Sequence, residues 1–229
     1  MSASNERVAI VAGAGGELGR VTAEKLAAAG FTVVGVDRKE EGLKELPDGI
    51  RREAADPTDP AAARSVIDRI AAEVGPPEVL VNTIGMFHPG EALTVTPEDL
   101  RLMIDVNLGA ALWLTQAVVP YLRDRSSGSI VHVAARPGVE PTAGMATSAV
   151  SKAALVYLTR VLDLELRSLG IRVNAVAPAL IVNAKNRPYL PPDLLAHATA
   201  AGAIADIIIY LLSDAAAPIG GAIVPAYGA

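Results

Sequence analysis

A glycine-rich turn near the N-terminus has the residue types and spacing of a phosphate-binding turn. It follows the apolar run of residues 8–12 and precedes a segment of helical periodicity. Glycines leave room for backbone N–H groups to approach a pyrophosphate, whose negative charge is favoured at the start of a helix. The residues expected to bind such a ligand are Gly13, Gly15, Gly16, Glu17, Leu18 and Gly19.

An acidic residue is expected to contact the sugar of the same ligand. Asp37 follows the apolar run of residues 31–36 and lies eighteen positions after Gly19. A carboxylate at this point can accept hydrogen bonds from the adenosine ribose hydroxyls and would repel a 2′-phosphate. The sequence therefore favours NAD(H) over NADP(H) as cofactor, although the neighbouring Arg38 would reduce the discrimination.

Further motifs, in order along the chain, resemble those of the short-chain dehydrogenase/reductase family over nearly the whole length. Gly13, Gly16 and Gly19 match its G-x-x-G-x-x-G turn, residues 82–85 resemble its Asn-Asn-Ala-Gly motif, and residues 171–178 resemble its sixth strand. The resemblance adds to the expected cofactor contacts Asp56, Pro57, Asn82, Gly85, Lys152, Pro178, Ala179 and Ile181.

The resemblance also implies a catalytic set of asparagine, serine, tyrosine and lysine, which this chain retains only in part. Asn107 and Lys152 match the asparagine and the lysine, whereas Ser148 stands at the tyrosine position and Ala135 at the serine position. Alanine has no hydrogen-bond donor, and an aliphatic hydroxyl is a far weaker acid than a phenol. Losing both groups would slow the usual reaction by roughly 10⁴–10⁷-fold.

Few other side chains are candidates for the missing proton donor. His88 would lie in a loop near the cleft, but a solvated loop histidine is the favoured interpretation. Tyr189 belongs to a segment expected to cover the cleft. Tyr157 falls about 140° around its helix from Lys152 and is interpreted as a packing or interface residue. His132 is expected to be buried in a strand and to bond a neighbouring backbone group.

Two functions of different classes therefore remain open. The first is an atypical NAD(H)-dependent oxidoreductase acting on a carbonyl or alcohol, with water, substrate, His88 or Tyr189 supplying the proton. The second is a catalytically inactive cofactor-binding subunit or sensor that partners another protein. Because the lysine ammonium can bind the ribose diol without transferring a proton, retention of Asn107 and Lys152 argues for cofactor binding more than for turnover. Isomerisation or cyclisation has no identifiable base.

The elements that must position these residues alternate in type. Six strands can be placed at residues 8–12, 31–36, 79–84, 130–134, 171–175 and 222–225, and helices at 18–29, 61–74, 98–105, 108–123, 147–169 and 203–212. This order predicts an α/β, doubly wound Rossmann fold, a three-layer αβα sandwich with a parallel seven-stranded sheet. We expect a single domain, 1–229, with a short substrate-covering segment around 183–201.

Composition excludes several other classes. The 20 basic and 25 acidic residues give a net charge of −5 without a basic cluster, so no nucleic-acid partner is expected. The absence of cysteine and the scattered histidines predict no metal site. The longest apolar stretch, residues 203–212, is too short to span a membrane, and no secretory signal is recognised, so we expect a cytoplasmic protein. The resemblance implies a homo-oligomer, dimer or tetramer, or a hetero-oligomer with an active relative.

Overall fold

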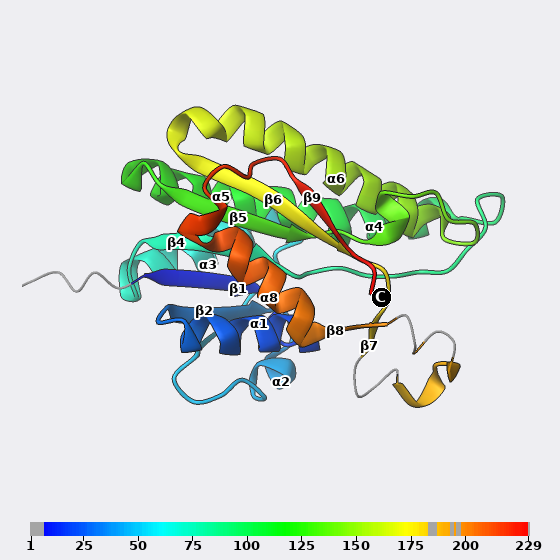
Figure 1. Ribbon diagram of the computed structural model, residues 1–229, viewed down its shortest axis with the longest axis horizontal. Helices are drawn as coiled ribbons and strands as arrows, with labels where there is room; N and C mark the ends of the chain where they lie inside the picture. Colours follow the sequence, from blue (N-terminus) through cyan, green and yellow to red (C-terminus); the bar gives the residue numbers. More distant parts are fainter. Residues whose placement is uncertain (1–6, 183–186, 193–194, 196–197, 229) are drawn as a thin grey trace, which may run out of the picture.

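The strands form one parallel sheet in the order β3-β2-β1-β4-β5-β6-β9 (Figure 1). The computed structural model describes residues 7–228 except 183–186, 193–194 and 196–197. The chain runs outward from β1 to β3, returns to β4 beside β1, and then builds the other half. The doubly wound α/β prediction is confirmed. The strands are β1 Val8–Ala12, β2 Thr32–Asp37, β3 Arg51–Ala54, β4 Pro77–Asn82, β5 Gly128–Val133, β6 Ile171–Pro178 and β9 Ile223–Ala226.

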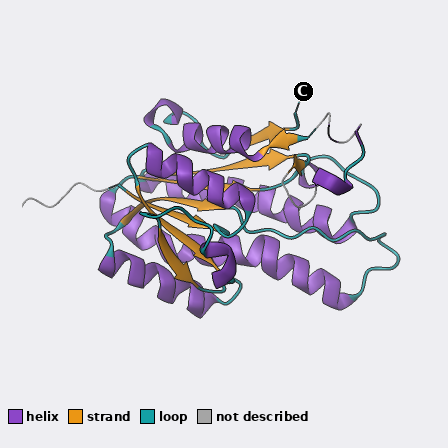
Figure 2. Ribbon diagram, turned by 90° about the horizontal axis from the view of Figure 1, so that it is seen from below, coloured by secondary structure: helices purple, strands orange, loops and turns teal. Residues whose placement is uncertain are grey.

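Helices cover both faces of the sheet and give the three layers seen in Figure 2. A hydrophobic core lies on each face of the sheet, and alternate residues of β1 point into one or the other. Val11 belongs to the core under α1 (Glu17–Ala28) and α8 (Ala201–Leu212). Ile10 packs with the opposite face, covered by α3 (Pro60–Glu73), α5 (Ala110–Arg125) and α6 (Ala146–Leu166). Because both faces are buried, the central strands are apolar on both sides.

Two predicted helices, 98–105 and 108–123, are one continuous helical run in the structure. A capping box between Thr96 and Asp99 starts α4 (Pro97–Ile104), and a π-helical turn, Asp105–Gly109, joins α4 to α5 without a break. The joined run, Pro97–Arg125, is long and apolar enough to cross a membrane, which the sequence analysis did not anticipate. Half of its most apolar 18-residue stretch is buried inside the protein, as in many core helices.

The sequence analysis did not place β3 and the short helix α2 (Glu40–Leu43). β3 reads Arg-Arg-Glu-Ala and pairs only with β2, so it lies at the edge of the sheet. An edge strand is held by its backbone on one side and can be polar. Glu53, its buried acid, is ion-paired with Arg51 and Arg69, so its charge is compensated.

The topology brings the functional candidates to one edge of the sheet. In a parallel sheet all strands end at the same edge, and the loops after β1, β2, β4, β5 and β6 therefore meet there. A separate two-stranded sheet, β7 (Ile181–Val182) and β8 (Thr199–Ala200), lies beyond the end of β6. The segment predicted to cover the cleft, 183–201, lies partly outside the described residues.

Candidate functional site

The glycine turn after β1 is packed too closely for side chains at two of its positions. Gly13 has a φ of +82°, and a Cβ there would lie 2.5 Å from the Thr83 hydroxyl. A Cβ at Gly19 would overlap the carbonyl oxygen of Gly13. The helix α1 begins directly after Gly16, and this N-cap residue has no side chain to cap the first turn. The predicted residues Glu17 and Leu18 begin this helix, so the turn presents an uncapped helix N-terminus to the cleft.

Asp37, the last residue of β2, is fixed by the turn that it faces. One carboxylate oxygen, Oδ2, accepts a hydrogen bond from Gly15 N at 3.1 Å, and Oδ1 accepts one from Lys39 N at 3.1 Å. Gly42 of α2 also packs on Gly15, where a Cβ on Gly42 would lie 2.8 Å from the Gly15 Cα. The carboxylate and the glycine turn therefore form one rigid unit.

A cavity of about 230 Å³ adjoins this unit. Its lining includes seven of the residues predicted to bind the cofactor: Gly13, Gly16, Asp37, Arg38, Asp56, Pro57 and Gly85. Sequence reasoning missed the other lining residues, Thr58, Thr83, Ile84, Met86 and Val106. Thr58 could have been found, because an aspartate two residues before a threonine is typical of a turn closed by the aspartate side chain. Asp56 Oδ1 indeed accepts hydrogen bonds from Thr58 N at 3.0 Å and Thr58 Oγ1 at 2.7 Å.

Asn107, on the π-helical turn, anchors the loop that follows β4. Its Oδ1 accepts from Met86 N at 2.8 Å, and its Nδ2 donates to Met86 O at 3.0 Å and to Ser151 Oγ at 2.9 Å. The buried amide thus holds Met86, a wall of the cavity, against α6. Asn82 fixes the start of the same loop, because its Oδ1 accepts from Ile84 N at 3.1 Å.

Lys152, on α6, is a buried cation beneath the same loop. Its Nζ donates to the carbonyl oxygen of Val133 at 2.7 Å, at the end of β5. Burial lowers its pKa from 10.5 to about 8, because removal from water disfavours the charged form. A Cβ on Gly85 would lie 2.8 Å from Nζ and 3.3 Å from Asn107 Oδ1. The fold therefore brings Gly85, Asn107 and Lys152 together, as predicted from sequence.

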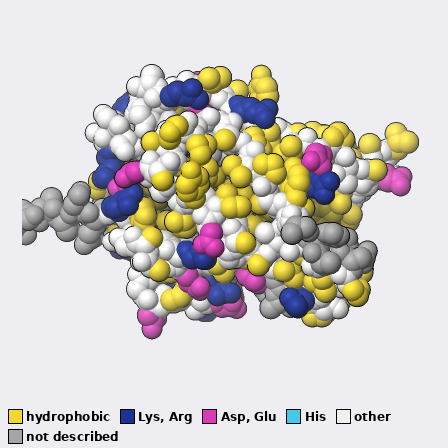
Figure 3. Space-filling model, viewed as in Figure 1, with side chains coloured by type: hydrophobic (Ala, Val, Ile, Leu, Met, Phe, Trp, Pro, Cys, Tyr) yellow, Lys and Arg dark blue, Asp and Glu magenta, His cyan; other side chains and the backbone are white. Residues whose placement is uncertain are grey.

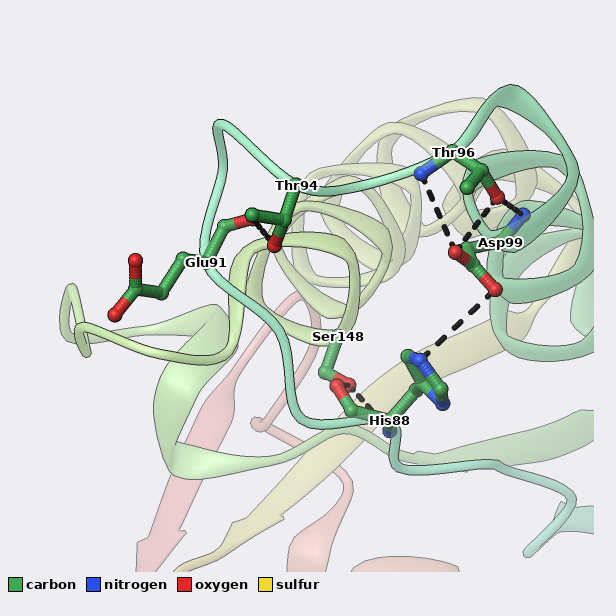
Figure 4. A network of polar contacts seen from close by, with 6 residues as sticks. All are labelled: His88, Glu91, Thr94, Thr96, Asp99 and Ser148. Carbon is green, nitrogen blue, oxygen red and sulfur yellow. Dashed lines mark hydrogen bonds and ion pairs between the residues drawn. The ribbon is translucent and has the colours of Figure 1, made fainter.

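Ser148 lies in the first turn of α6, and Ala135 lies just after β5. The Ser148 hydroxyl accepts a hydrogen bond from His88 N at 2.8 Å and donates one to His88 O at 2.9 Å (Figure 4). Ala135 follows the end of β5 and starts a short turn that ends at Gly138. Gly138 packs against the backbone of Lys152, so the turn lies directly on α6.

Other candidates lie away from this cluster or offer no free group. The Tyr157 and Tyr189 side chains are 70% and 86% exposed, respectively. His132 is fully buried in β5, where burial lowers its pKa to about 3. Neither of its ring nitrogens has a partner among the described residues, in contrast to the backbone contact expected for it. Pro178 ends β6, followed by Ala179, while Ile181 lies in β7.

Comparisons with known proteins agree with this geometry. The family model described as "short chain dehydrogenase" matches residues 7–191. The chain belongs to the short-chain dehydrogenase family. It is 32% identical to the 3-oxoacyl-[acyl-carrier-protein] reductase of Escherichia coli (strain K12), over 94% of this chain and 93% of that protein. It is 34% identical to the 2,3-dihydro-2,3-dihydroxybenzoate dehydrogenase of Bacillus subtilis (strain 168), over 75% and 69% of the two chains.

Solved structures show the same short-chain dehydrogenase fold. A crystal structure described as ribose-5-phosphate isomerase from Brucella melitensis 16M superposes with a TM-score of 0.91 at 27% identity, covering 98% of this chain and 92% of that one. The structure of gox2181 gives a TM-score of 0.89 at 26% identity, covering 96% and 93%. Membership of this oxidoreductase family implies a nicotinamide dinucleotide cofactor. The glycine turn fits such a group, because it places a helix N-terminus at the cleft, and side chains at Gly13 or Gly19 would force this turn out of shape.

Proposed function

We propose that this protein is an NAD(H)-binding oxidoreductase that interconverts a carbonyl and an alcohol with a degenerate active site. The observation that carries this proposal is the glycine turn held against Asp37, with Lys152 buried at the other end of the same sheet edge. When bound, the nicotinamide supplies or accepts a hydride. Asp37 would bind the adenosine ribose, Asp56 the adenine, and Lys152 the nicotinamide ribose.

The preference for NAD(H) rests on the charges around Asp37. A second hollow beside the turn is lined by Asp37, Glu41 and Glu45, with Lys39 as its basic residue. A 2′-phosphate placed there would meet a surplus of negative charge. Arg38, which lines the main cavity, offsets part of this repulsion. The sum of these charges favours a ribose with a free 2′-hydroxyl.

Replacing Asp37 by asparagine should reverse much of this discrimination. Asp37→Asn keeps the size and one oxygen acceptor, which can still accept from Gly15 N, while the hydrogen bond from Lys39 N is lost and the repulsive charge disappears. We expect NADPH to bind about 10-fold more tightly and NADH several-fold more weakly, as measured by calorimetric titration. Asp48→Asn, which removes an equal charge at an exposed position, is the control. Unchanged NADPH affinity in Asp37→Asn would contradict the assignment of Asp37 as the ribose ligand.

The degenerate site is proposed from the chemistry of Ala135 and Ser148. Ala135 offers no donor to orient a substrate oxygen. Ser148 is buried, and its single proton is already donated to His88 O, so it has none to give a substrate. The same observation favours the second candidate, a catalytically inactive cofactor-binding subunit or sensor. The two candidates differ in whether the cofactor-loaded protein turns over.

Steady-state conversion separates the two candidates. NADH oxidation would be followed with a panel of ketones, quinones and enones, to which a 3-oxoacyl thioester is added because of the relative in E. coli. NAD⁺ reduction would be followed with cyclic diols, because of the relative in B. subtilis. We expect slow turnover of at least one compound. Tight NADH binding with no turnover of any compound would reject the oxidoreductase and favour the inactive subunit.

We also propose that the protein self-associates through α6. Val150, Tyr157 and Leu164 are spaced by seven residues, so they share one helix face, and each is more than half exposed. Figure 3 shows hydrophobic side chains gathered on the face of the molecule that carries α6, β9 and α8 in Figure 1. Contiguous exposed apolar surface of this kind marks an interaction site.

A further inference from the structure

The loop after β4 is docked on α6 at the position where the family has its tyrosine. The Ser148 hydroxyl is hydrogen-bonded to both the N–H and the carbonyl oxygen of His88. Two residues further on, Gly90 N donates to Gly144 O at 2.9 Å and Gly90 O accepts from Ala146 N at 3.0 Å. The loop is therefore held at His88 and at Gly90, and the direction in which the His88 side chain leaves the loop is set.

The His88 imidazole faces a carboxylate that is itself held in place. His88 Nε2 lies 3.9 Å from Asp99 Oδ1 on α4 (Figure 4). The other oxygen, Asp99 Oδ2, accepts from Thr96 N at 3.2 Å and Thr96 Oγ1 at 2.7 Å in the capping box. These hydrogen bonds lower the Asp99 pKa, so the carboxylate stays charged. The Asp99 carboxylate therefore places a fixed negative charge on the Nε2 side of the ring.

His88 lies close to the cofactor cavity in the chain. Met86, two residues earlier, lines the cofactor cavity and is clamped by Asn107. Ser148, which holds His88, lies one helical turn before Lys152 on α6. Half of the His88 side chain is exposed, so the ring can exchange protons with water. The residue therefore follows a wall residue of the cavity by two positions and is reached by water.

We propose that His88 is the proton donor and acceptor of this protein, positioned by Ser148 and Asp99, in place of the absent tyrosine. This inference rests on the proposed oxidoreductase function. In the reducing direction the carbonyl carbon receives the hydride, the carbonyl oxygen takes the proton from His88 Nδ1, and the neutral ring regains a proton from water. In the oxidising direction the ring takes the hydroxyl proton as the hydride leaves carbon. Histidine suits both directions because its ordinary pKa is near neutrality.

The arrangement differs from a nucleophilic serine site. In such a site the imidazole accepts the hydroxyl proton of the serine. Here the Ser148 hydroxyl is bonded to the backbone of His88 and not to its ring. Ser148 is thus a positioning residue, and covalent catalysis by its oxygen is not part of the proposal.

Removing the His88 ring nitrogens should slow turnover without weakening cofactor binding. With the best substrate of the panel, His88→Gln should lower kcat by about 100-fold or more, the usual contribution of general acid–base catalysis. The NADH dissociation constant, measured by calorimetry, should stay within about twofold of wild type because His88 lies outside the cofactor cavity. Added imidazole should restore several-fold activity to His88→Ala. Glu91→Gln, an exposed change on the same loop, is the matched control and should behave as wild type.

The positioning residues have their own readouts. Ser148→Ala should raise the hydrogen-exchange rate of the His88 amide by about 10-fold or more in the cofactor-free protein, because its hydrogen bond is lost. Asp99→Asn should lower kcat in the wild-type background and have no further effect in His88→Gln. Equal kcat for His88→Gln and wild type would overturn the role of His88 while leaving the oxidoreductase intact. NADH binding without turnover by the wild type would overturn both.

Discussion

Lys152→Met is expected to stabilise the protein relative to wild type by about 3 kcal/mol more at pH 8 than at pH 10.5. The reason is the buried ammonium, whose pKa falls from 10.5 to about 8 on folding. Between these pH values the unfolded chain binds more protons than the folded one, so wild-type stability rises with pH across this window. Below about pH 8 the wild-type protein bears the full cost of burying the charged Lys152 ammonium. The methionine variant has no charge to bury at this position, so it does not bear this cost.

Urea unfolding of both proteins at half-unit steps from pH 7.5 to 10.5 measures this difference. The exposed Lys44→Met is the control, and its stability difference from wild type should not change with pH, because its ammonium stays in water in both states. A flat difference for Lys152→Met over the same range would show that the ammonium is not desolvated. The proposed ribose contact of Lys152 would then lose its structural basis.

Gly19→Ala is expected to abolish useful cofactor binding. Its new Cβ would overlap the carbonyl of Gly13 and lie 2.8 Å from the Ala14 Cα, and backbone atoms cannot yield as a side chain can. The turn must open, so the NADH affinity should fall by about 100-fold or more. The free energy of unfolding should fall by about 1–3 kcal/mol, as for other overpacked sites.

Gly202→Ala on α8 is the matched control for this substitution. The nearest heavy atom to its Cβ would be Lys25 Cε at 4.0 Å, and alanine favours a helix more than glycine does. We expect unchanged NADH affinity and equal or greater stability, measured by calorimetry and urea unfolding. If Gly19→Ala bound NADH as tightly as Gly202→Ala, the glycine turn would not be the pyrophosphate site.

The sequence predicts well those elements that the hydrophobic pattern alone is sufficient to define. The buried strand around Ile10 is a continuous apolar run, and the glycines at 30 and 170 both adopt the positive φ typical of helix ends. β3 was missed because an edge strand is held by backbone pairing, which leaves no apolar pattern. The π-helical turn around Asn107 was missed because periodicity cannot distinguish a widened turn from a break.

The candidate site likewise has parts that the sequence predicts and parts that it does not. The spacing of Gly13, Gly19 and Asp37 was sufficient to predict the turn and its acid, since their roles depend on backbone geometry close in sequence. The contact between Ser148 and His88 joins residues 60 positions apart and depends on how the loop docks on α6. Nothing in the local pattern indicates it, and the solvated interpretation of His88 overlooked its fixed backbone and its contact with Asp99.

Calorimetric titration of the wild-type protein with NAD⁺, NADH and NADPH tests the central proposal most directly. The proposed site predicts saturable binding of NADH in the micromolar range and binding of NADPH at least about 10-fold weaker. No binding of NAD⁺ or NADH at millimolar concentration would contradict the assignment of the glycine turn, Asp37 and Lys152 as a functional cofactor-binding site.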